Sequence, residues 1–336
     1  MSRRVRMAIV GCGAISHWHV DAMERSAVPI DVVAAVDPVA ANADRIAART
    51  SAVTYSSLDA ALDARDIDGA LIAVPHHLHE DTATRALGAG LHVLLEKPLA
   101  PTLDACDRIL DAAAAAGTVF MVAENAQYWP EVRTARRLVA EGAIGDVVTA
   151  RAATFFPALD EFYGGTRPWR FDRAAAGGGV AIDTGSHWLR PLRIWLGEVD
   201  EVVAALDRPD PRMEGESLCR ALLRFASGTI ASFDAMLAQG AIAPQPLFTI
   251  TGSTGEITVE ASGWVKLWDG RDWKGTKVGE PGGYLQSYEY ELADFASAVL
   301  DGTEPAAPAA YALGELRIAL AMYASAQSGR WEKVWA

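Results

Sequence analysis

Three side chains in this 336-residue sequence have the types and spacing for proton transfer: Lys97, Asp183 and His187. An imidazole titrates near neutral pH, so His187 could take a proton from a hydroxyl group. Asp183 precedes it by four residues, which places both side chains on one face if the segment is helical. The carboxylate could then hold a substrate or orient the histidine, although an ordinary surface pair would have the same spacing. Gly185 favours the first interpretation, because glycine is costly within a helix and indicates that another group approaches closely.

Lys97 stands at the end of a predicted buried strand, because the apolar run from Val93 is bounded by Gly90 and Pro98. Ligands of open α/β sheets bind outside the carboxyl ends of the strands. A lysine at that end would place its ammonium group over a bound ligand, whereas a surface ion pair with Glu96 is the alternative. We also expect a cis peptide bond between Lys97 and Pro98.

A dinucleotide-binding signature lies near the start of the chain, where the apolar strand predicted over Val5–Val10 runs into Gly11, Gly13 and a helical stretch. Gly11 permits a tight turn, and Gly13 lets the backbone approach a pyrophosphate at the helix N-terminus. Ser16 occupies the third position of the motif, where a small side chain still allows close packing. A tight turn without a ligand is the alternative. The loop residues that we expect to contact the cofactor are Gly11, Gly13, Ala14 and Ile15.

The second predicted strand, Asp31–Val36, leads to Asp37, about twenty residues beyond the glycine loop, where a carboxylate binds the ribose hydroxyls of a dinucleotide. A carboxylate there would repel the 2′-phosphate of NADP. No arginine follows immediately, and the nearest is Arg45. We therefore expect NAD as the cofactor and NADP as the less favoured one. A turn or helix-capping aspartate before Pro38 is the alternative, and one residue could serve both roles.

Strands and helices alternate over about the first 120 residues, which predicts a doubly wound parallel sheet. One of these strands, Gly69–Val74, leads to Pro75, His76, His77 and His79. Three histidines could indicate zinc, but the following helix would spread them around its first turn, and no cysteine or carboxylate joins them. We therefore expect no metal here and interpret this segment as loop and helix-start residues that contact a cofactor.

The residues beyond position 123 predict a second, α+β domain, because alternating strand-like runs and glycine turns indicate a large, mostly antiparallel sheet. We expect domains at 1–123 and 124–336, with a late helix around 310–327 packing back on the first. The net charge of −13 argues against nucleic acid as a partner. No apolar run is long enough for a membrane span, no export signal is visible and the cysteines are scattered, so we expect a cytoplasmic protein.

In their order along the chain, these motifs resemble the glucose-fructose oxidoreductase and inositol dehydrogenase family (Gfo/Idh/MocA). The resemblance covers nearly the whole chain and rests on the Gly11 loop, on Glu96-Lys97-Pro98, and on the three glycines that lead to Asp183 and His187. Val74, Pro75 and His79 are similar to the turn that covers the cofactor in this family, and Asn125 is similar to its domain junction. Trp169 and Arg170, which precede the three glycines, are also similar to the family pattern.

The resemblance implies a Rossmann domain, an open-faced sheet domain that builds homodimers or homotetramers, and a nicotinamide held between the domains. It implies hydride transfer between NAD(P) and a secondary alcohol of a sugar, sugar derivative or inositol. His187 would be the acid–base group, Lys97 would hold the reacting oxygen and lower the pKa of the alcohol, and Asp183 would bind substrate hydroxyls. The implied substrate-binding residues are Lys97, Gln127, Arg170, Asp183 and His187. Glu96, Lys97, Asn125, Trp169 and Arg170 would join the cofactor site.

Three positions depart from the family pattern: His76 stands where Asn is frequent, Gln127 where a basic residue is common, and Arg190 where an Asp often occurs. A cation near the site could favour a carboxylate or phosphate on the substrate, but we favour a structural salt bridge for Arg190. Two functions other than a simple dehydrogenase remain open. One is an enzyme that keeps NAD bound through aldose–aldose oxidoreduction or redox-assisted glycoside cleavage. The other is an NAD-sensing regulator, against which the three intact acid–base side chains argue.

Overall fold

The computed structural model describes residues 3–64, 66–157, 160–164, 168–238, 243, 245–279 and 284–335. The chain forms two compact units. The N-terminal unit comprises Met1–Ala123 and Tyr288–Leu313, and the C-terminal unit comprises Glu124–Ser287 and Gly314–Ala336. The sequence predicts domains at 1–123 and 124–336, a division that would place Tyr288–Leu313 in the second domain. Within the N-terminal unit this segment is held by the edge-on packing of Tyr288 on His19, with ring centroids 4.8 Å apart.

The N-terminal unit contains a six-stranded sheet in the order β3-β2-β1-β4-β5-β6, and all of its pairings are parallel. This is the strand order of the dinucleotide-binding Rossmann fold, so the predicted doubly wound sheet is confirmed. β4 is buried at every position, as expected for a strand that is covered on both faces. The strands are β1 (Val5–Val10), β2 (Ile30–Val36), β3 (Val53–Tyr55), β4 (Gly69–Ile72), β5 (His92–Glu96) and β6 (Phe120–Ala123).

The helices of this unit begin and end at residues with recognisable capping chemistry. The Thr102 hydroxyl accepts a hydrogen bond from the backbone N–H of Ala105 and starts α5, which ends at Gly117 with a φ of +64°. The elements are α1 (Ala14–Arg25), α2 (Ala40–Thr50), α3 (Leu58–Ala64), η1 (His76–Leu78), α4 (His79–Gly88), α5 (Leu103–Ala116) and η4 (Ala309–Ala312), and most of α10 (Tyr284–Asp301).

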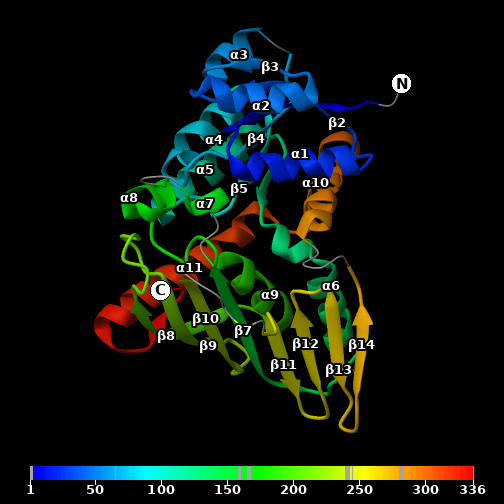
Figure 1. Cartoon of the computed structure of the whole chain (residues 1–336), viewed down its shortest axis with the longest axis vertical. Helices are drawn as coiled ribbons and strands as arrows, with labels where there is room; N and C mark the ends of the chain where they lie inside the picture. The colour runs from blue at the N-terminus through cyan, green and yellow to red at the C-terminus, as the bar shows by residue number, and fades with distance from the viewer. Residues whose placement is uncertain are drawn as a thin grey trace. The chain divides into compact units, whose positions relative to one another are not determined.

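The C-terminal unit contains a nine-stranded sheet in the order β14-β13-β12-β11-β7-β10-β9-β8-β15 (Figure 1). Its pairings are antiparallel except for β7 with β10, which confirms the mostly antiparallel sheet. The strands are β7 (Val147–Pro157), β8 (Val199–Asp207), β9 (Leu218–Phe225), β10 (Ile230–Ala238), β11 (Phe248–Gly252), β12 (Glu256–Glu260), β13 (Trp264–Trp268), β14 (Trp273–Lys277) and β15 (Glu332–Lys333).

The helices of this unit lie against the sheet, and α9 contacts both β7 and the short helix η2. Aromatic packing fixes α9, because Trp195 stands edge-on to Phe248 of β11 with ring centroids 4.9 Å apart. The helices are η2 (Asn125–Tyr128), α6 (Pro130–Ala140), α7 (Asp160–Tyr163), η3 (Trp169–Phe171), α8 (Arg173–Ala176), α9 (Ser186–Leu196) and α11 (Leu313–Ser328). The late helix expected on the first domain is α11, which from Gly314 onward belongs to the C-terminal unit. None of the helices in the described ranges has the length and apolar character needed to cross a membrane.

Candidate active site

The loop between β1 and α1 is built around two glycines with different surroundings. Gly11 has a φ of +87°, and a Cβ atom there would lie 2.5 Å from the carbonyl oxygen of Ala73, so only glycine fits. Around Gly13, by contrast, a Cβ atom would meet no neighbouring group within 4 Å. α1 begins at Ala14 with no side chain capping its N-terminus, which leaves its first N–H groups available to an anion. The open glycine and the uncapped helix fit a dinucleotide pyrophosphate.

Asp37, at the end of β2, is buried and ties this loop to the sheet. Its carboxylate accepts hydrogen bonds from the backbone N–H of Cys12 at 2.9 Å, the backbone N–H of Val39 at 2.8 Å and the side-chain amide of Asn42 at 3.2 Å. Burial, together with the Asp37 charge, raises the pKa of the Cys12 thiol to about 12, so this thiol stays protonated. Asp37 therefore has the predicted turn role, and its contact with a ribose stays a prediction.

The end of β5 presents Lys97 on a buried support. The Glu96 carboxylate accepts the backbone N–H of Lys97 at 3.1 Å and contacts Nε2 of His19 at 2.9 Å. His19 lies on α1 and is fully buried, and Glu96 is only 6% exposed, so the Glu96 carboxylate is a buried support rather than an exposed one. The peptide bond between Lys97 and Pro98 is cis, as expected.

His79 connects the turn after β4 to the turn after β5. Its Nδ1 lies 2.9 Å from the carbonyl oxygen of Pro98, and its Nε2 lies 3.0 Å from that of Val74. Burial lowers the pKa of His79, so the neutral ring donates to one of these carbonyls only. Pro75 precedes η1 in the same turn. Within the described ranges no three histidine, cysteine, aspartate or glutamate side chains gather in a way that could hold a metal ion.

In the C-terminal unit, His187 lies in the first turn of α9, but Asp183 lies in the turn that precedes this helix. The prediction that the two residues share one helical face is therefore wrong, because the chain at 180–185 is a series of turns rather than a helix. Gly185 is the last residue of that turn, and a Cβ atom there would meet the carbonyl oxygen of Ala181 and would lie 2.9 Å from the ring of Phe233. The close approach that Gly185 indicated is made by the protein itself, through the preceding turn at Ala181 and through Phe233 of β10.

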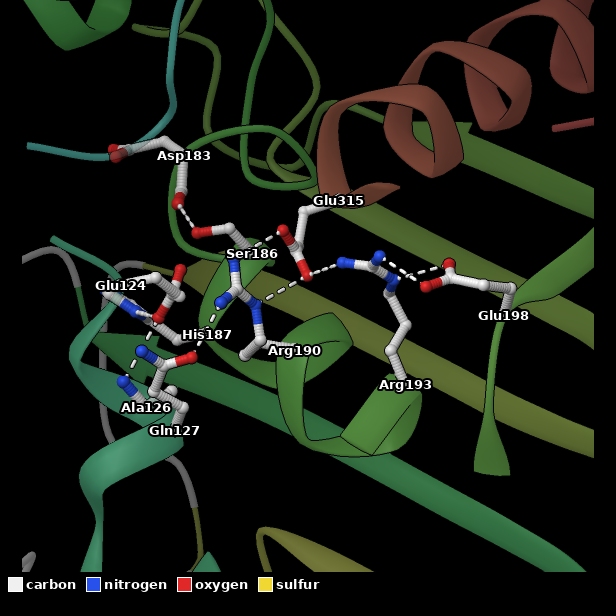
Figure 2. A network of polar contacts seen from close by, with 10 residues as sticks. All are labelled: Glu124, Ala126, Gln127, Asp183, Ser186, His187, Arg190, Arg193, Glu198 and Glu315. Carbon is white, nitrogen blue, oxygen red and sulfur yellow. Dashed lines mark hydrogen bonds and ion pairs between the residues drawn. The ribbon is translucent and has the colours of Figure 1, made fainter. Parts of the chain in front are cut away.

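The His187 ring is held by a carboxylate that the sequence interpretation did not include. Nδ1 of His187 lies 2.5 Å from Oε1 of Glu124, and the same carboxylate oxygen accepts the backbone N–H of Ala126 at 3.2 Å (Figure 2). Glu124 is 1% exposed and His187 is 6% exposed. An ionised carboxylate only accepts hydrogen bonds, so Nδ1 carries the proton and Nε2 of the neutral ring is left as the basic nitrogen.

Asp183 is paired with a different set of side chains. Nε of Arg170 lies 3.3 Å from Oδ2 of Asp183, and the hydroxyl of Tyr163 donates to the same oxygen at 3.4 Å. The Arg170 guanidinium also stacks over the ring of Trp169, 4.3 Å from its centroid. Burial raises the pKa of Tyr163, and the charge of Asp183 adds to this, so the phenol remains a donor. The structure thus brings together the predicted residues Trp169, Arg170 and Asp183.

Arg190 lies one turn beyond His187 and forms the structural salt bridge that we favoured. Its Nε and Nη2 contact the Glu315 carboxylate at 2.8 and 3.0 Å, and the residue is almost completely buried. Its Nη1 donates to Oε1 of Gln127 at 2.8 Å, which fixes the orientation of the Gln127 amide (Figure 2). Asn125, on the same short helix as Gln127, donates to the hydroxyl of Ser287 at 3.0 Å.

Two of the three glycines before Asp183, Gly178 and Gly179, pack against protein rather than forming an open loop. A Cβ atom at Gly178 would collide with the hydroxyl of Tyr323, and one at Gly179 would collide with the backbone of Glu216. The Glu216 carboxylate accepts the backbone N–H of Ala181 at 2.9 Å and the Tyr323 hydroxyl at 3.0 Å. The glycines are therefore required by the close packing that positions the turn containing Asp183.

Four residues that contact the predicted site were missed: His19, Glu124, Tyr163 and Glu315. All four lie 20 or more residues in sequence from the side chains that they hold. The one signal that could have indicated these contacts is the type of residue, because a buried histidine or carboxylate needs a hydrogen-bond partner.

Two family models match this chain. Residues 5–124 match the model described as an oxidoreductase family with an NAD-binding Rossmann fold, and residues 132–258 match the Gfo/Idh/MocA C-terminal domain. The first match covers the strands of the six-stranded sheet, and the second covers β7 to β11 and the start of β12 in the nine-stranded sheet.

Relatives of known activity include sugar dehydrogenases and reductases. A D-xylose 1-dehydrogenase (NADP(+)) of Haloferax volcanii is 30% identical over 91% of this chain and 94% of its own length. A 1,5-anhydro-D-fructose reductase of Ensifer adhaerens is 31% identical over 79% of each chain. Among solved structures, a levoglucosan dehydrogenase in complex with NADH and levoglucosan superposes with a TM-score of 0.89 at 23% identity, covering 99% of this chain and 100% of that one.

Proposed function

Because the chain belongs to the Gfo/Idh/MocA oxidoreductase family, we propose that it is an NAD-dependent dehydrogenase acting on a secondary alcohol of a sugar, sugar derivative or inositol. The observation that carries the proposal is the buried contact between Glu124 and Nδ1 of His187. It leaves Nε2 as the basic nitrogen, which is the group needed to take the proton of an alcohol. The sugar dehydrogenases among the relatives support the substrate class.

The glycine loop and the end of β2 are the elements that would hold the cofactor. The first N–H groups of α1, at Ala14 and Ile15, would bind the pyrophosphate of the cofactor, which could approach closely at the open backbone of Gly13. Asp37 would accept from the ribose hydroxyls in addition to the backbone N–H groups that it already holds. When bound, NAD supplies the hydride acceptor for the reaction.

The side chains of this protein would carry the proton and orient the substrate. The alcohol proton passes to Nε2 of His187, whose imidazolium form is stabilised by the Glu124 carboxylate. Lys97 holds the reacting oxygen, and its positive charge lowers the pKa of the alcohol. Asp183 binds further hydroxyls of the substrate and is itself held by Arg170. Gln127 contributes amide N–H donors, because its oxygen is already occupied by Arg190.

Hydride transfer across a panel of sugars and inositols tests the proposal. The wild-type protein should form free NADH in proportion to the oxidised product with at least one member. In Lys97→Ala, kcat/KM should fall by roughly 10²- to 10³-fold, because one group that stabilises developing negative charge is lost. Lys274→Ala is the matched control, since that lysine forms an exposed ion pair with Asp269. Equal turnover of wild type and Lys97→Ala would remove Lys97 from the reaction.

The same panel, run with NAD and with NADP, tests the role of Asp37. Asp37→Asn keeps an oxygen for the N–H of Cys12 but removes the negative charge that repels a 2′-phosphate. The ratio of NAD to NADP turnover should fall by about tenfold, which corresponds to about 1.4 kcal/mol. An unchanged ratio would show that Asp37 acts only on the loop.

The assembly and the cellular location belong to the same proposal. We expect a homodimer or homotetramer in the cytoplasm, formed through the nine-stranded sheet. Exposed apolar side chains lie on three neighbouring strands of that sheet, namely Val148 on β7, Ile230 on β10 and Leu222 on β9. Analytical ultracentrifugation at micromolar concentration checks the assembly, and a monomer would contradict it.

A further inference from the structure

Glu124 and the short helix η2 that follows it are joined to the start of α9 by two parallel side-chain contacts. Glu124 contacts His187, and Gln127 contacts Arg190. Glu124 and Gln127 are three residues apart, as are His187 and Arg190, and both contacts lie on the facing sides of the two segments (Figure 2). Arg190 also donates two hydrogen bonds to Glu315 of α11. These bonds fix the Arg190 side chain independently of His187.

The contact at His187 is held from both sides. Glu124 cannot turn away without losing the backbone N–H of Ala126, to which the same oxygen is bound. The imidazole ring packs beside Trp129 and Trp188, with ring centroids 6.3 Å away in each case. Both indoles are almost completely buried, so they restrict rotation of the ring. The direction of Nε2 is therefore set by packing as well as by the carboxylate.

Asp183 cannot take over this task in the arrangement observed, because its carboxylate is engaged by Arg170 and Tyr163. From the contact between Glu124 and His187 we infer that Glu124, rather than Asp183, is the positioning residue for the acid–base histidine. It selects the tautomer with the proton on Nδ1 and stabilises the imidazolium that forms when Nε2 takes the alcohol proton. This inference rests on the proposed dehydrogenase function and adds to it a residue that acts only through His187.

The charges around the ring determine the expected pH dependence. Glu124 is the negative group in contact with the imidazole, and Tyr284 of α10 packs edge-on to it with centroids 6.5 Å apart. On α9 the nearest charge is Arg190, which is paired with Glu315, and in the preceding turn it is Asp183, which is paired with Arg170. Among these anions, Asp183 and Glu315 are each paired with an arginine, whereas Glu124 contacts the imidazole itself. Removing the Glu124 charge should therefore destabilise the protonated imidazole of His187.

The test is the pH profile of kcat/KM for alcohol oxidation in wild type, Glu124→Gln and Glu124→Asp. In Glu124→Gln the amide can donate to Nδ1 and select the wrong tautomer, so kcat/KM should fall by about 10²- to 10⁴-fold with little change in KM. The acidic limb of the remaining activity should move to lower pH by about one unit. Glu124→Asp keeps the charge on a shorter side chain and should recover part of the rate.

A buried carboxylate elsewhere supplies the control. Glu131 on α6 is 2% exposed, and neither of its carboxylate oxygens has a hydrogen-bond partner among the described residues. Glu131→Gln makes the same chemical change in the same unit and should leave the pH profile in place. A loss of activity in Glu124→Gln with an unmoved pH profile and a raised KM would assign Glu124 a purely structural role.

Nitrogen-15 NMR of histidine-labelled, NAD-loaded protein gives a readout that does not depend on turnover. Wild type should show His187 with its proton on Nδ1, and Glu124→Gln should shift the population toward the Nε2–H form. A wild-type protein that oxidises no member of the panel would refute the proposed function while leaving this result readable. An Nε2–H tautomer in wild type, or a tautomer that Glu124→Gln does not change, would overturn the inference itself.

Discussion

A buried pair of a histidine and a glutamate occurs in each unit of the molecule, and the two pairs have opposite arrangements. In the N-terminal unit, the glutamate immediately precedes Lys97, which we propose to act on the substrate oxygen, and His19 supports this glutamate from α1 with a contact of 2.9 Å. In the C-terminal unit, the histidine is the proposed acid–base group, and Glu124, the residue that precedes η2, supports it with a contact of 2.5 Å. The same chemical pair is thus used once to hold a backbone turn and once to hold a ring.

The difference in exposure between the two histidines separates these roles. His19 is 0% exposed, whereas His187 is 6% exposed and has its second nitrogen left for a substrate. A completely buried imidazole cannot exchange protons with a ligand, so we expect His19 to contribute to stability. We expect His187 to contribute to rate.

The largest effect is expected from His187→Gln. A general base contributes about 10²- to 10⁴-fold, so kcat/KM should fall by that factor, which is about 3–5 kcal/mol in the barrier. The free energy of unfolding should change much less, because glutamine can still donate to Glu124. Initial rates and urea unfolding of the same preparation measure both quantities. If His187→Gln retained activity but lost stability, His187 would have the same structural role as His19, and the contrast between the two histidines would be wrong.

A smaller effect, and one on stability, is expected from His19→Leu. Glu96 would stay buried without its partner, which should lower the free energy of unfolding by about 1–3 kcal/mol. Adding Glu96→Gln removes the stranded charge and should recover part of that loss, as measured by urea denaturation of the single and double variants. If the double variant is no more stable than His19→Leu, the buried carboxylate is not the source of the loss.

The smallest effect concerns His79, which braces the two turns next to Lys97. Burial lowers its pKa in the folded chain below the ordinary value of about 6.5. The unfolded chain therefore binds the proton first, and the contribution of His79 to stability is present above about pH 6.5 and decreases as the pH falls below it. His79→Gln should be destabilised at pH 8 by about 1 kcal/mol, with a smaller difference at pH 5.5. Urea denaturation at both pH values checks this, and a difference that grows on acidification would contradict the sign.

The comparison also shows which parts of the site could be predicted from the sequence. The glycine loop, the strand that ends before Lys97 and the Thr102 cap follow from local patterns, and all are present in the structure. The supports could not be predicted, because His19 and Glu96 are 77 residues apart and Glu124 and His187 are 63 apart. No local periodicity links residues at such separations; only the fold does.

Asp183 illustrates a second limit. The four-residue spacing to His187 predicted a shared helical face, but the glycine-rich segment before it forms turns whose shape depends on contacts with Glu216 and Tyr323. For Arg190, residue type and environment were enough, since a buried arginine requires a carboxylate, and Glu315 provides it.

The close packing around Gly178 and Gly179, which leaves no room for a side chain, limits how this enzyme could be re-engineered. A side chain at either position would push against Tyr323 or the backbone of Glu216 and would move the turn that carries Asp183. Libraries aimed at new substrates should therefore keep both glycines, together with the Arg170 side chain that holds Asp183, and vary Gln127. Gln127 is a proposed substrate contact that does not set the path of the backbone, so changes there should alter recognition while the acid–base groups stay in place.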